Sequence, residues 1–117
     1  MKEMVMIIRP EKLEIVKAIL DEARCGGMTI STVMGCGTQK GQTDEVYANV
    51  IKGMKVNINL LPKIRVEVVV PDEMVEVIYA EVRDKVATGR HGDGKIFIRP
   101  IENAFRIRTG ETGEKAL

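Results

Sequence analysis

The feature that most constrains the fold is a strand–helix–strand pattern that occurs twice, with a long polar segment between the two copies. Strands are expected at 4–8, 28–34, 64–70 and 96–98, and helices are expected to begin at Glu11 and at 71–73. Two such halves build the split βαβ, or ferredoxin-like, arrangement, in which both helices cover one face of an antiparallel sheet. We therefore predict an α+β fold of the βαββαβ type, with a long loop at about residues 37–60 between the second and third strands.

Hydrophobic periodicity is the basis for these elements. The apolar residues of the first helix recur at helical spacing, and Gly26-Gly27 is expected to end this helix. The run at 4–8 is continuously apolar, which suits a strand buried on both faces. At 64–70, apolar residues at even positions alternate with mostly charged residues, a pattern typical of a strand with one buried face.

Length and composition indicate a single globular domain over residues 1–117, with a C-terminal segment at about 101–117. Hydrophobic residues make up 44% of the chain, which is enough for a core, whereas a net charge of +1 and the absence of Trp argue against a nucleic-acid-binding surface. Two cysteines and one histidine supply neither a disulfide framework nor a zinc site. The apolar start is too short for a signal peptide or a membrane span, so we expect a cytoplasmic protein that does not insert into membranes.

Three glycines with the spacing Gly35-x-Gly37-x-x-x-Gly41 open the long loop. Because glycines allow the backbone to approach a ligand closely, this segment is a candidate anion-binding site, and a flexible hinge is the alternative. It lacks the spacing and the following helix of a dinucleotide-binding fingerprint. A connection this long in a compact domain is usually functional or disordered, and we expect it to contact a target.

A second glycine-rich segment, residues 89–96, matches the P-loop skeleton in its glycines and lysine only. Ile96 replaces the Ser or Thr that would hold Mg²⁺, and the residues that follow are strand-like rather than helical. Backbone N–H groups of such a segment can still form an anion-binding nest, with Arg90 and Lys95 as neighbouring cations. A turn with solvated charges is the alternative.

Arg106 and Arg108 form a third candidate cluster, because alternation puts both side chains on the same side of an extended segment. Two guanidinium groups on one face suit a polyphosphate, whereas a solvated basic edge is the alternative. Convergence of all three clusters on one sheet edge would favour a shared site. His91 and Cys36 are expected to be a turn residue and a small packing residue, since no nucleophile–base pair has a recognisable local signature.

These segments resemble the PII nitrogen-regulatory signal-transduction family over nearly the whole chain. The matching motifs are Ile7-Ile8-Arg9-Pro10-Glu11-Lys12-Leu13, Gly27-Met28-Thr29, Gly35-Cys36-Gly37-Thr38-Gln39-Lys40-Gly41, Leu61-Pro62-Lys63, Val69-Val70-Pro71-Asp72, residues 88–97 and Ile107-Arg108-Thr109-Gly110-Glu111. The resemblance implies a homotrimer of ferredoxin-like subunits, with nucleotide sites in the clefts between neighbours. It also implies a regulator rather than an enzyme, with a protruding T-loop, here at about residues 37–60, that docks onto target proteins.

The resemblance further implies which residues bind effectors. The adenosine side of ATP or ADP would be lined by Ile7, Thr29, Gly35, Gly37 and Val69. Ribose and phosphates would be held by Gly89, Gly92, Asp93, Gly94, Lys95, Arg106 and Arg108, with Thr38 and Gln39 also at the nucleotide. Gln39 would coordinate Mg²⁺ together with the ATP phosphates and 2-oxoglutarate. The carboxylates of 2-oxoglutarate would be bound by Gln39, Lys40, Gly41 and Lys63.

The chain departs from the family in its T-loop. Thr38 stands where the family usually has an arginine, which we expect to weaken ATP binding or to change the discrimination between ATP and ADP. Residues 44–55 replace the family's shorter segment, which carries a uridylylated tyrosine and an arginine that enters the ammonium-channel pore. Tyr47 is therefore not matched to the modified tyrosine. The altered loop looks like that of the nitrogenase-associated subgroup, whose paired, related subunits inhibit dinitrogenase until 2-oxoglutarate relieves the inhibition.

We therefore predict a nitrogen regulator that senses ATP, ADP and 2-oxoglutarate and controls nitrogenase activity in nitrogen fixation, as a homotrimer or as a heteromer with a related subunit. Regulation of an ammonium transporter is the alternative, and a small nucleotide-hydrolysing enzyme is disfavoured because no positioned base is visible. The expected partner-binding residues are Tyr47, Val50, Ile51 and Met54. Their spacing predicts a helix at the loop tip when it meets the target.

Overall fold

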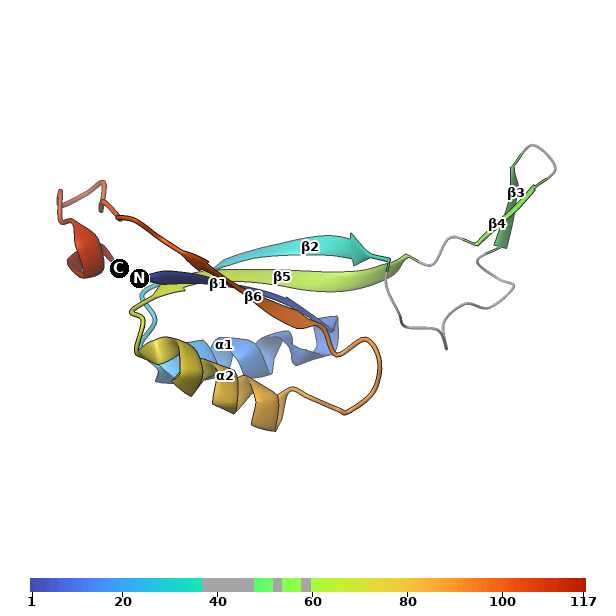
Figure 1. Cartoon of the computed structure of the whole chain (residues 1–117), viewed down its shortest axis with the longest axis horizontal. Coiled ribbons are helices and arrows are strands. Elements are labelled where there is room, and N and C mark those ends of the chain that lie inside the picture. The colour runs from blue at the N-terminus through green and yellow to red at the C-terminus, as the bar shows by residue number, and fades with distance from the viewer. Residues whose placement is uncertain (37–47, 52–53, 58–59) are drawn as a thin grey trace.

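Two layers make up the fold: a four-stranded antiparallel sheet, and two helices that cover one of its faces (Figure 1). The computed structural model describes residues 1–36, 48–51, 54–57 and 60–117. In chain order the elements are β1 (Lys2–Ile8), α1 (Leu13–Glu22), β2 (Thr29–Gly35), β3 (Ala48–Ile51), β4 (Met54–Asn57), β5 (Leu61–Val70), α2 (Met74–Lys85) and β6 (Lys95–Pro100). Short 3₁₀ turns lie at Pro10–Lys12 and Gly113–Ala116.

The strands of the sheet lie in the order β2-β5-β1-β6, and each is antiparallel to its neighbours. β1 and β5 are therefore central, and the two βαβ halves interleave as in a ferredoxin-like domain. In the register, Met6 of β1 lies opposite Val66 of β5 and Ile96 of β6, so these three residues share the face toward the helices. The predicted α+β, ferredoxin-like fold is confirmed.

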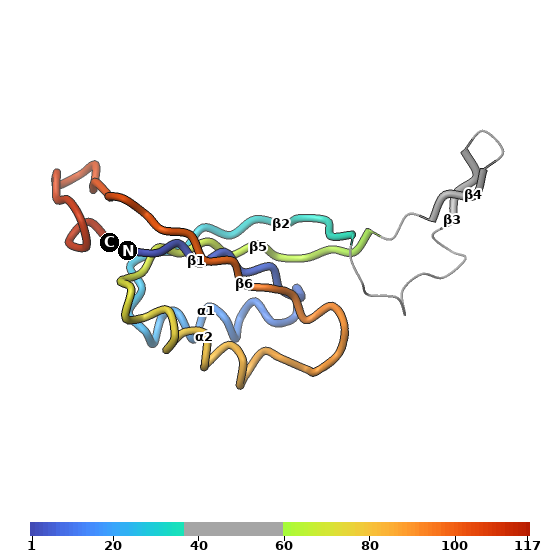
Figure 2. Tube along the Cα trace, in the orientation of Figure 1, coloured from blue at the N-terminus to red at the C-terminus, as the bar shows by residue number. Residues whose placement is uncertain are grey.

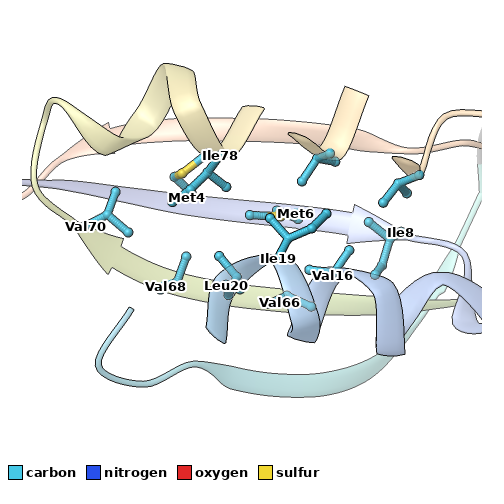
Figure 3. Packing of buried hydrophobic residues seen from close by; sticks show 12 residues of the cluster. Met4, Met6, Ile8, Val16, Ile19, Leu20, Val66, Val68, Val70 and Ile78 are labelled. Atoms are coloured by element: carbon cyan, nitrogen blue, oxygen red, sulfur yellow. The ribbon is translucent and has the colours of Figure 1, made fainter. Parts of the chain in front are cut away.

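The hydrophobic core lies between the sheet and the two helices (Figure 3). Its buried members are Met4, Met6 and Ile8 from β1, Val66, Val68 and Val70 from β5, Val16, Ile19 and Leu20 from α1, Ile78 and Val82 from α2, and Val86 just after α2. Full burial of one such side chain contributes about 1.5–3 kcal/mol relative to exposure, so this cluster is the main source of stability. The even positions of β5 are the buried ones, as the alternation predicted.

The end of α1 differs from the prediction. The helix stops at Glu22, and Arg24 takes the left-handed conformation, with φ of 57°, before the two glycines are reached. The N–H of Arg24 donates to the oxygen of Asp21 at 2.9 Å, and the N–H of Cys25 donates to the oxygen of Leu20 at 3.0 Å. This is the hydrogen-bond pattern of a Schellman cap. Gly26 and Gly27 belong to the following turn because an arginine already supplies the left-handed residue.

The sheet face opposite the helices is only partly apolar. Val5 is buried there, whereas Ile7 is half-buried, so the prediction of a strand buried on both faces holds for only part of β1. Arg65 and Glu67 pair on this face, with 2.7 Å between Nε and Oε1, and Arg99 pairs with Glu3. A face with this mixture of charge and half-buried apolar residues is partly solvated in the isolated chain.

Exposed apolar side chains lie along both edges of the sheet. Ile30 and Met34 are exposed on the edge strand β2, and Phe97 and Ile98 are exposed on the opposite edge strand β6. Further large apolar residues are exposed on α2 and in the segment after β6, where Ile107 has essentially its full surface in solvent. Edges of this kind favour association with another chain. In the described part of the chain, no helix combines the length and the apolar character needed to span a bilayer.

The tip of the predicted T-loop is a β-hairpin rather than a helix. β3 and β4 pair only with each other, with Val50 opposite Lys55 and Ile51 opposite Met54. The helix expected at the tip belongs to the target-bound state and stays a prediction, whereas residues 48–51 and 54–57 of the isolated chain are strands. Antiparallel pairing of β3 with β4 satisfies backbone groups that a helix would pair locally, and β-branched residues such as Val50 and Ile51 favour strands.

Candidate functional site

The loop that joins α2 to β6, residues 88–94, lies at the end of the sheet opposite the two chain termini (Figure 2). Gly89, Gly92 and Gly94 all have positive φ, at 83°, 95° and 102°. Gly94 also lies directly on β1: a Cβ at this position would be 1.7 Å from the main-chain oxygen of Ile7. Only glycine fits such a contact, so this residue fixes the loop against the end of the strand.

The carboxylate of Asp93 organises the interior of the 88–94 loop. Its Oδ2 accepts hydrogen bonds from the N–H groups of Thr88 at 2.7 Å and Gly89 at 2.9 Å. Its Oδ1 accepts from the hydroxyl of Thr88 and from Nε of Arg9 at 3.3 Å. Burial alone would raise the pKa of Asp93, but these hydrogen bonds outweigh it and hold the pKa well below its usual range. Asp93 is therefore ionised at neutral pH.

Two cations from the body of the fold also hold this loop. Nη2 of Arg9, which follows β1, donates to the main-chain oxygen of His91 at 2.7 Å. Nζ of Lys63, on β5, donates to the main-chain oxygen of Gly92 at 2.6 Å. Burial, followed by the neighbouring positive charge of Arg9, lowers the pKa of Lys63, and Asp93 acts in the opposite direction. The loop is thus attached to both central strands of the sheet.

A cavity of about 480 Å³, here called the loop cavity, opens between this loop and the neighbouring strand ends. Its apolar wall includes Ile7, Leu61 and Phe97, and its cations are Lys63, Arg90 and Lys95. The remaining lining residues are Gly35, Cys36, His91, Gly92, Asp93 and Gly94. A concave site with an apolar wall and several cations suits an organic anion such as a nucleotide or a dicarboxylate.

A second cavity of about 360 Å³, here called the terminal cavity, lies where the C-terminal segment returns to the sheet. Its lining residues are Glu3, Gly26, Gly27, Thr29, Glu67, Val68, Val69, Arg106, Ala116 and Leu117. Nη2 of Arg106 donates to the main-chain oxygen of Leu117 at 2.6 Å, and Nη1 lies 3.4 Å from Oε1 of Glu111. Gly26 leaves room for this contact, since a Cβ there would be 2.8 Å from the carbonyl carbon of Leu117.

The predicted nucleotide residues divide between the two cavities. Ile7, Gly35, Gly92, Asp93, Gly94 and Lys95 line the loop cavity, and Thr29, Val69 and Arg106 line the terminal cavity. Gly89 lines a neighbouring groove between α2 and β6, and Arg108 is an exposed residue that lines neither cavity. Within one chain the three clusters therefore do not converge on one edge. The reason is the direction of β6, which carries the chain from the 88–94 loop to the opposite end of the sheet (Figure 1).

Several predicted residues lie outside the described part of the chain: Gly37, Thr38, Gln39, Lys40, Gly41 and Tyr47. Gln39, the predicted Mg²⁺ ligand, is among them. Over the described residues, no group of three or more His, Cys, Asp or Glu side chains is placed to hold a metal ion. Lys63, the remaining residue predicted for 2-oxoglutarate, lines the loop cavity.

Sequence reasoning missed the parts played by Arg9 and Thr88. Arg9 enters the sequence analysis only as part of the motif at residues 7–13, and its partner Asp93 lies 84 positions away in sequence, so no local pattern indicates the contact. Thr88 carries only a weak signal, because Thr and Asp side chains commonly bond backbone groups in turns without fixing which groups they meet. Cys36 lines the loop cavity and is exposed, rather than packed as expected.

Comparison with known proteins adds an independent line of argument. The model of the family described as "Nitrogen regulatory protein P-II" matches residues 1–111. "Nitrogen regulatory protein P-II 2" of Methanothermobacter thermautotrophicus is 48% identical over 117 residues, covering 100% of this chain and 97% of that protein. "Nitrogen regulatory protein P-II" of Rhodobacter capsulatus is 45% identical and that of Haemophilus influenzae 44% identical, each over 117 residues and 100% of both chains.

A ferredoxin-like chain with matches of this extent is a regulatory signal transducer of nitrogen metabolism rather than an enzyme. The chain belongs to the nitrogen regulatory protein P-II family. Members of this family bind effectors and regulate target proteins.

Proposed function

We propose that this chain forms a homotrimer, or a heteromer with a related subunit, that senses ATP, ADP and 2-oxoglutarate and controls a target protein through its T-loop. The target proposed first is a nitrogenase component. The single observation that carries the effector part of the proposal is the division of the expected nucleotide residues between two cavities at opposite ends of the sheet.

Each cavity supplies a different part of a nucleotide site. The loop cavity offers three cations for phosphates beside an apolar wall. The terminal cavity offers Arg106 near the small residues Gly27 and Thr29, and a Cβ added to Gly27 would meet nothing within 4 Å, which would leave room for a flat ring. A second copy that brings its terminal cavity against the loop cavity of the first would complete the site, and this is how a nucleotide would be held between subunits.

The edges of the sheet support such an assembly. β2 and β6 are the two edge strands, and each carries exposed large apolar side chains. Contact between unlike edges of successive copies is a heterologous interface, which closes into a ring when the rotation between copies allows it. A three-membered ring would hold three equivalent sites.

The oxoacid is proposed to bind beside the nucleotide, at Lys63 and the backbone of residues 39–41. Lys63 has 9% of its surface exposed, and its ammonium is held at the loop cavity by Gly92, so its position is fixed before a ligand arrives. Mg²⁺ at Gln39 would bridge the ATP phosphates and the oxoacid, which supplies a physical reason for one ligand to strengthen the other.

The proposal of a nitrogenase target rests on the sequence of residues 44–55. This segment lacks the arginine with which family members enter an ammonium-channel pore, so an ammonium transporter is the second candidate target. The hairpin formed by β3 and β4 lies within this part of the chain and is proposed as the element that contacts the target.

Mixing two defective subunits tests whether the nucleotide site lies between copies. Lys95→Ala removes a cation from the loop cavity, and Arg106→Ala removes the cation of the terminal cavity. Loss of a charge-assisted contact of about 1.5–3 kcal/mol should lower ATP affinity about tenfold or more in each variant alone. In a randomly mixed ring, about a quarter of the sites combine the intact halves of two neighbours and regain tight binding.

As the control, Lys95→Ala and Arg106→Ala are each taken through the same subunit-exchange procedure alone, without the other variant. Calorimetry should find no high-affinity sites in these controls and a minor class of high-affinity sites in the mixture. A mixture that binds ATP no better than its components would overturn the intersubunit site. Unchanged affinity in both single variants would remove these residues from the site altogether.

A further inference from the structure

We infer that Arg9 and Asp93 are positioning residues for the phosphates of a bound nucleotide: they do not contact the ligand but hold the 88–94 loop so that Arg90 and Lys95 are presented to the loop cavity. This inference rests on the proposed nucleotide site. It identifies the residues that hold the 88–94 loop in position without lining up against the ligand. Arg9, Asp93 and Thr88 are together called the latch.

The carboxylate of Asp93 has no acceptor capacity left for a ligand. An ionised carboxylate offers about four lone-pair positions, and four donors already occupy this one: the hydroxyl and N–H of Thr88, the N–H of Gly89 and Nε of Arg9. A ribose hydroxyl or a metal ion would have to displace one of these donors. The geometry therefore assigns Asp93 to the loop itself.

The same contacts change the interpretation of the glycine-rich segment. The N–H groups of Thr88 and Gly89 were candidates for an anion-binding nest, and the anion that they bind is the side chain of Asp93. A phosphate in the loop cavity would then be held chiefly by the cations of the lining, Arg90 and Lys95. Their placement depends on the backbone between Thr88 and β6.

Arg9 holds that backbone at two points. Its Nε reaches Asp93 and its Nη2 reaches the main-chain oxygen of His91, so one planar guanidinium spans the two residues on either side of Gly92. The side chain of Arg9 is 13% exposed, as expected for a structural contact rather than a solvated charge. A lysine would preserve the charge but presents no planar fork and cannot reproduce both bonds at once.

The consequence is a loop that is already ordered before a nucleotide arrives. Ordering of a mobile loop on binding opposes association, whereas a loop fixed in the bound conformation avoids that cost. Loss of the latch should therefore weaken binding of the phosphate-bearing part of the ligand, with little effect on the adenosine part, which would lie against the apolar wall of the cavity.

The test compares Arg9→Lys, Asp93→Asn and the double variant with wild type, as complete, assembled protein. Calorimetry with ATP and with adenosine gives the phosphate-dependent part of the affinity, and hydrogen exchange at the amides of Thr88 and Gly89 reports the latch directly. We expect each single variant to lose roughly 3- to 10-fold in ATP affinity while adenosine affinity stays within about twofold. Exchange at the two amides should accelerate in parallel.

The double variant distinguishes positioning from direct contact. Two residues that act as one unit give non-additive effects, so the double variant should bind ATP about as well as the weaker single variant. Additive losses would mean that Arg9 touches the phosphates itself and would overturn the inference. Lys85→Gln, which breaks an ion pair with Glu81 on α2 and lines neither cavity, is the control and should bind ATP like wild type.

The remaining outcomes are also decisive. Wild-type affinity in Arg9→Lys and Asp93→Asn would overturn the inference and leave the proposed site standing. Equal losses for ATP and adenosine, accompanied by a lower melting temperature, would show a general structural role and overturn it as well. A wild-type protein that binds no ATP would overturn the proposed function, and the inference with it.

Discussion

Nζ of Lys63 lies 2.6 Å from the main-chain oxygen of Gly92 and donates a hydrogen bond to it across the loop cavity. This contact joins β5, which leads directly out of the T-loop, to the loop that would carry the nucleotide phosphates. A ligand that binds the ammonium of Lys63 would therefore affect both β5, next to the T-loop, and the 88–94 loop. The proposed oxoacid is such a ligand.

The first prediction concerns Lys63→Gln. Removal of the ammonium deletes a charge-assisted contact worth about 1.5–3 kcal/mol, so affinity for 2-oxoglutarate measured in MgATP should fall about tenfold or more. Lys17→Gln, at an exposed α1 position where lysine pairs with Glu14, is the control and should leave the affinity unchanged.

The same titrations test reciprocity. MgATP must raise the affinity for 2-oxoglutarate by the factor by which 2-oxoglutarate raises the affinity for MgATP. Equal oxoacid affinities with and without MgATP would place the oxoacid site elsewhere, or show that there is none.

The second prediction concerns Gly94→Ala. The new Cβ would meet the main-chain oxygen of Ile7 at 1.7 Å, and φ of 102° is itself unfavourable for alanine. We expect a loss of stability well beyond the roughly 1–2 kcal/mol of a left-handed alanine alone. Gly110 has a similarly positive φ of 74°, but no atom lies within 4 Å of an added Cβ. Gly110→Ala therefore measures the loss of stability that comes from the unfavourable φ alone. Similar melting temperatures for the two variants would contradict the close contact with β1.

The third prediction follows from the depressed pKa of Asp93. A carboxyl whose pKa is lower in the folded than in the unfolded chain stabilises the fold at a pH above the unfolded value, near 3.9, and this contribution is lost as the pH falls from there toward the folded pKa. The stability difference between wild type and Asp93→Asn should therefore be constant from about pH 7 to pH 5 and shrink below about pH 4. Denaturant unfolding of both proteins at each pH measures this difference in the free energy of unfolding. A difference that persists unchanged at pH 3 would mean that the hydrogen bonds of Asp93 do not depend on its charge.

The fourth prediction concerns the T-loop. Deletion of residues 47–55 removes the β3–β4 hairpin but leaves both cavities and Lys63 in place. Assembly, measured by ultracentrifugation, and ATP affinity should stay at wild-type values, while capture of a nitrogenase component in a pull-down should be lost. Effector-dependent binding of the target by the shortened chain would show that another surface carries the output.

The order of elements was predictable because its determinants are local. Alternation at the even positions of β5 and helical spacing in α1 and α2 reflect the periods of a strand and a helix, which hold wherever those segments lie. The end of α1 was less predictable, since Arg24 occupies a left-handed position that the sequence favours at Gly26 or Gly27. The strands β3 and β4 were not predicted, because short apolar runs with β-branched residues fit a helical face and a strand equally well.

The sequence by itself determined the α+β class and the identity of the glycine-rich and basic clusters, since each of these depends on residues that are neighbours along the chain. The tertiary structure decided where those clusters lie: β6 separates Lys95 from Arg106 by the length of the sheet and places them in different cavities. It also decided which groups remain available to a ligand. Arg9 and Asp93 meet across 84 positions because the start of β6 pairs with the end of β1, and pairing between strands distant in sequence leaves no local signature.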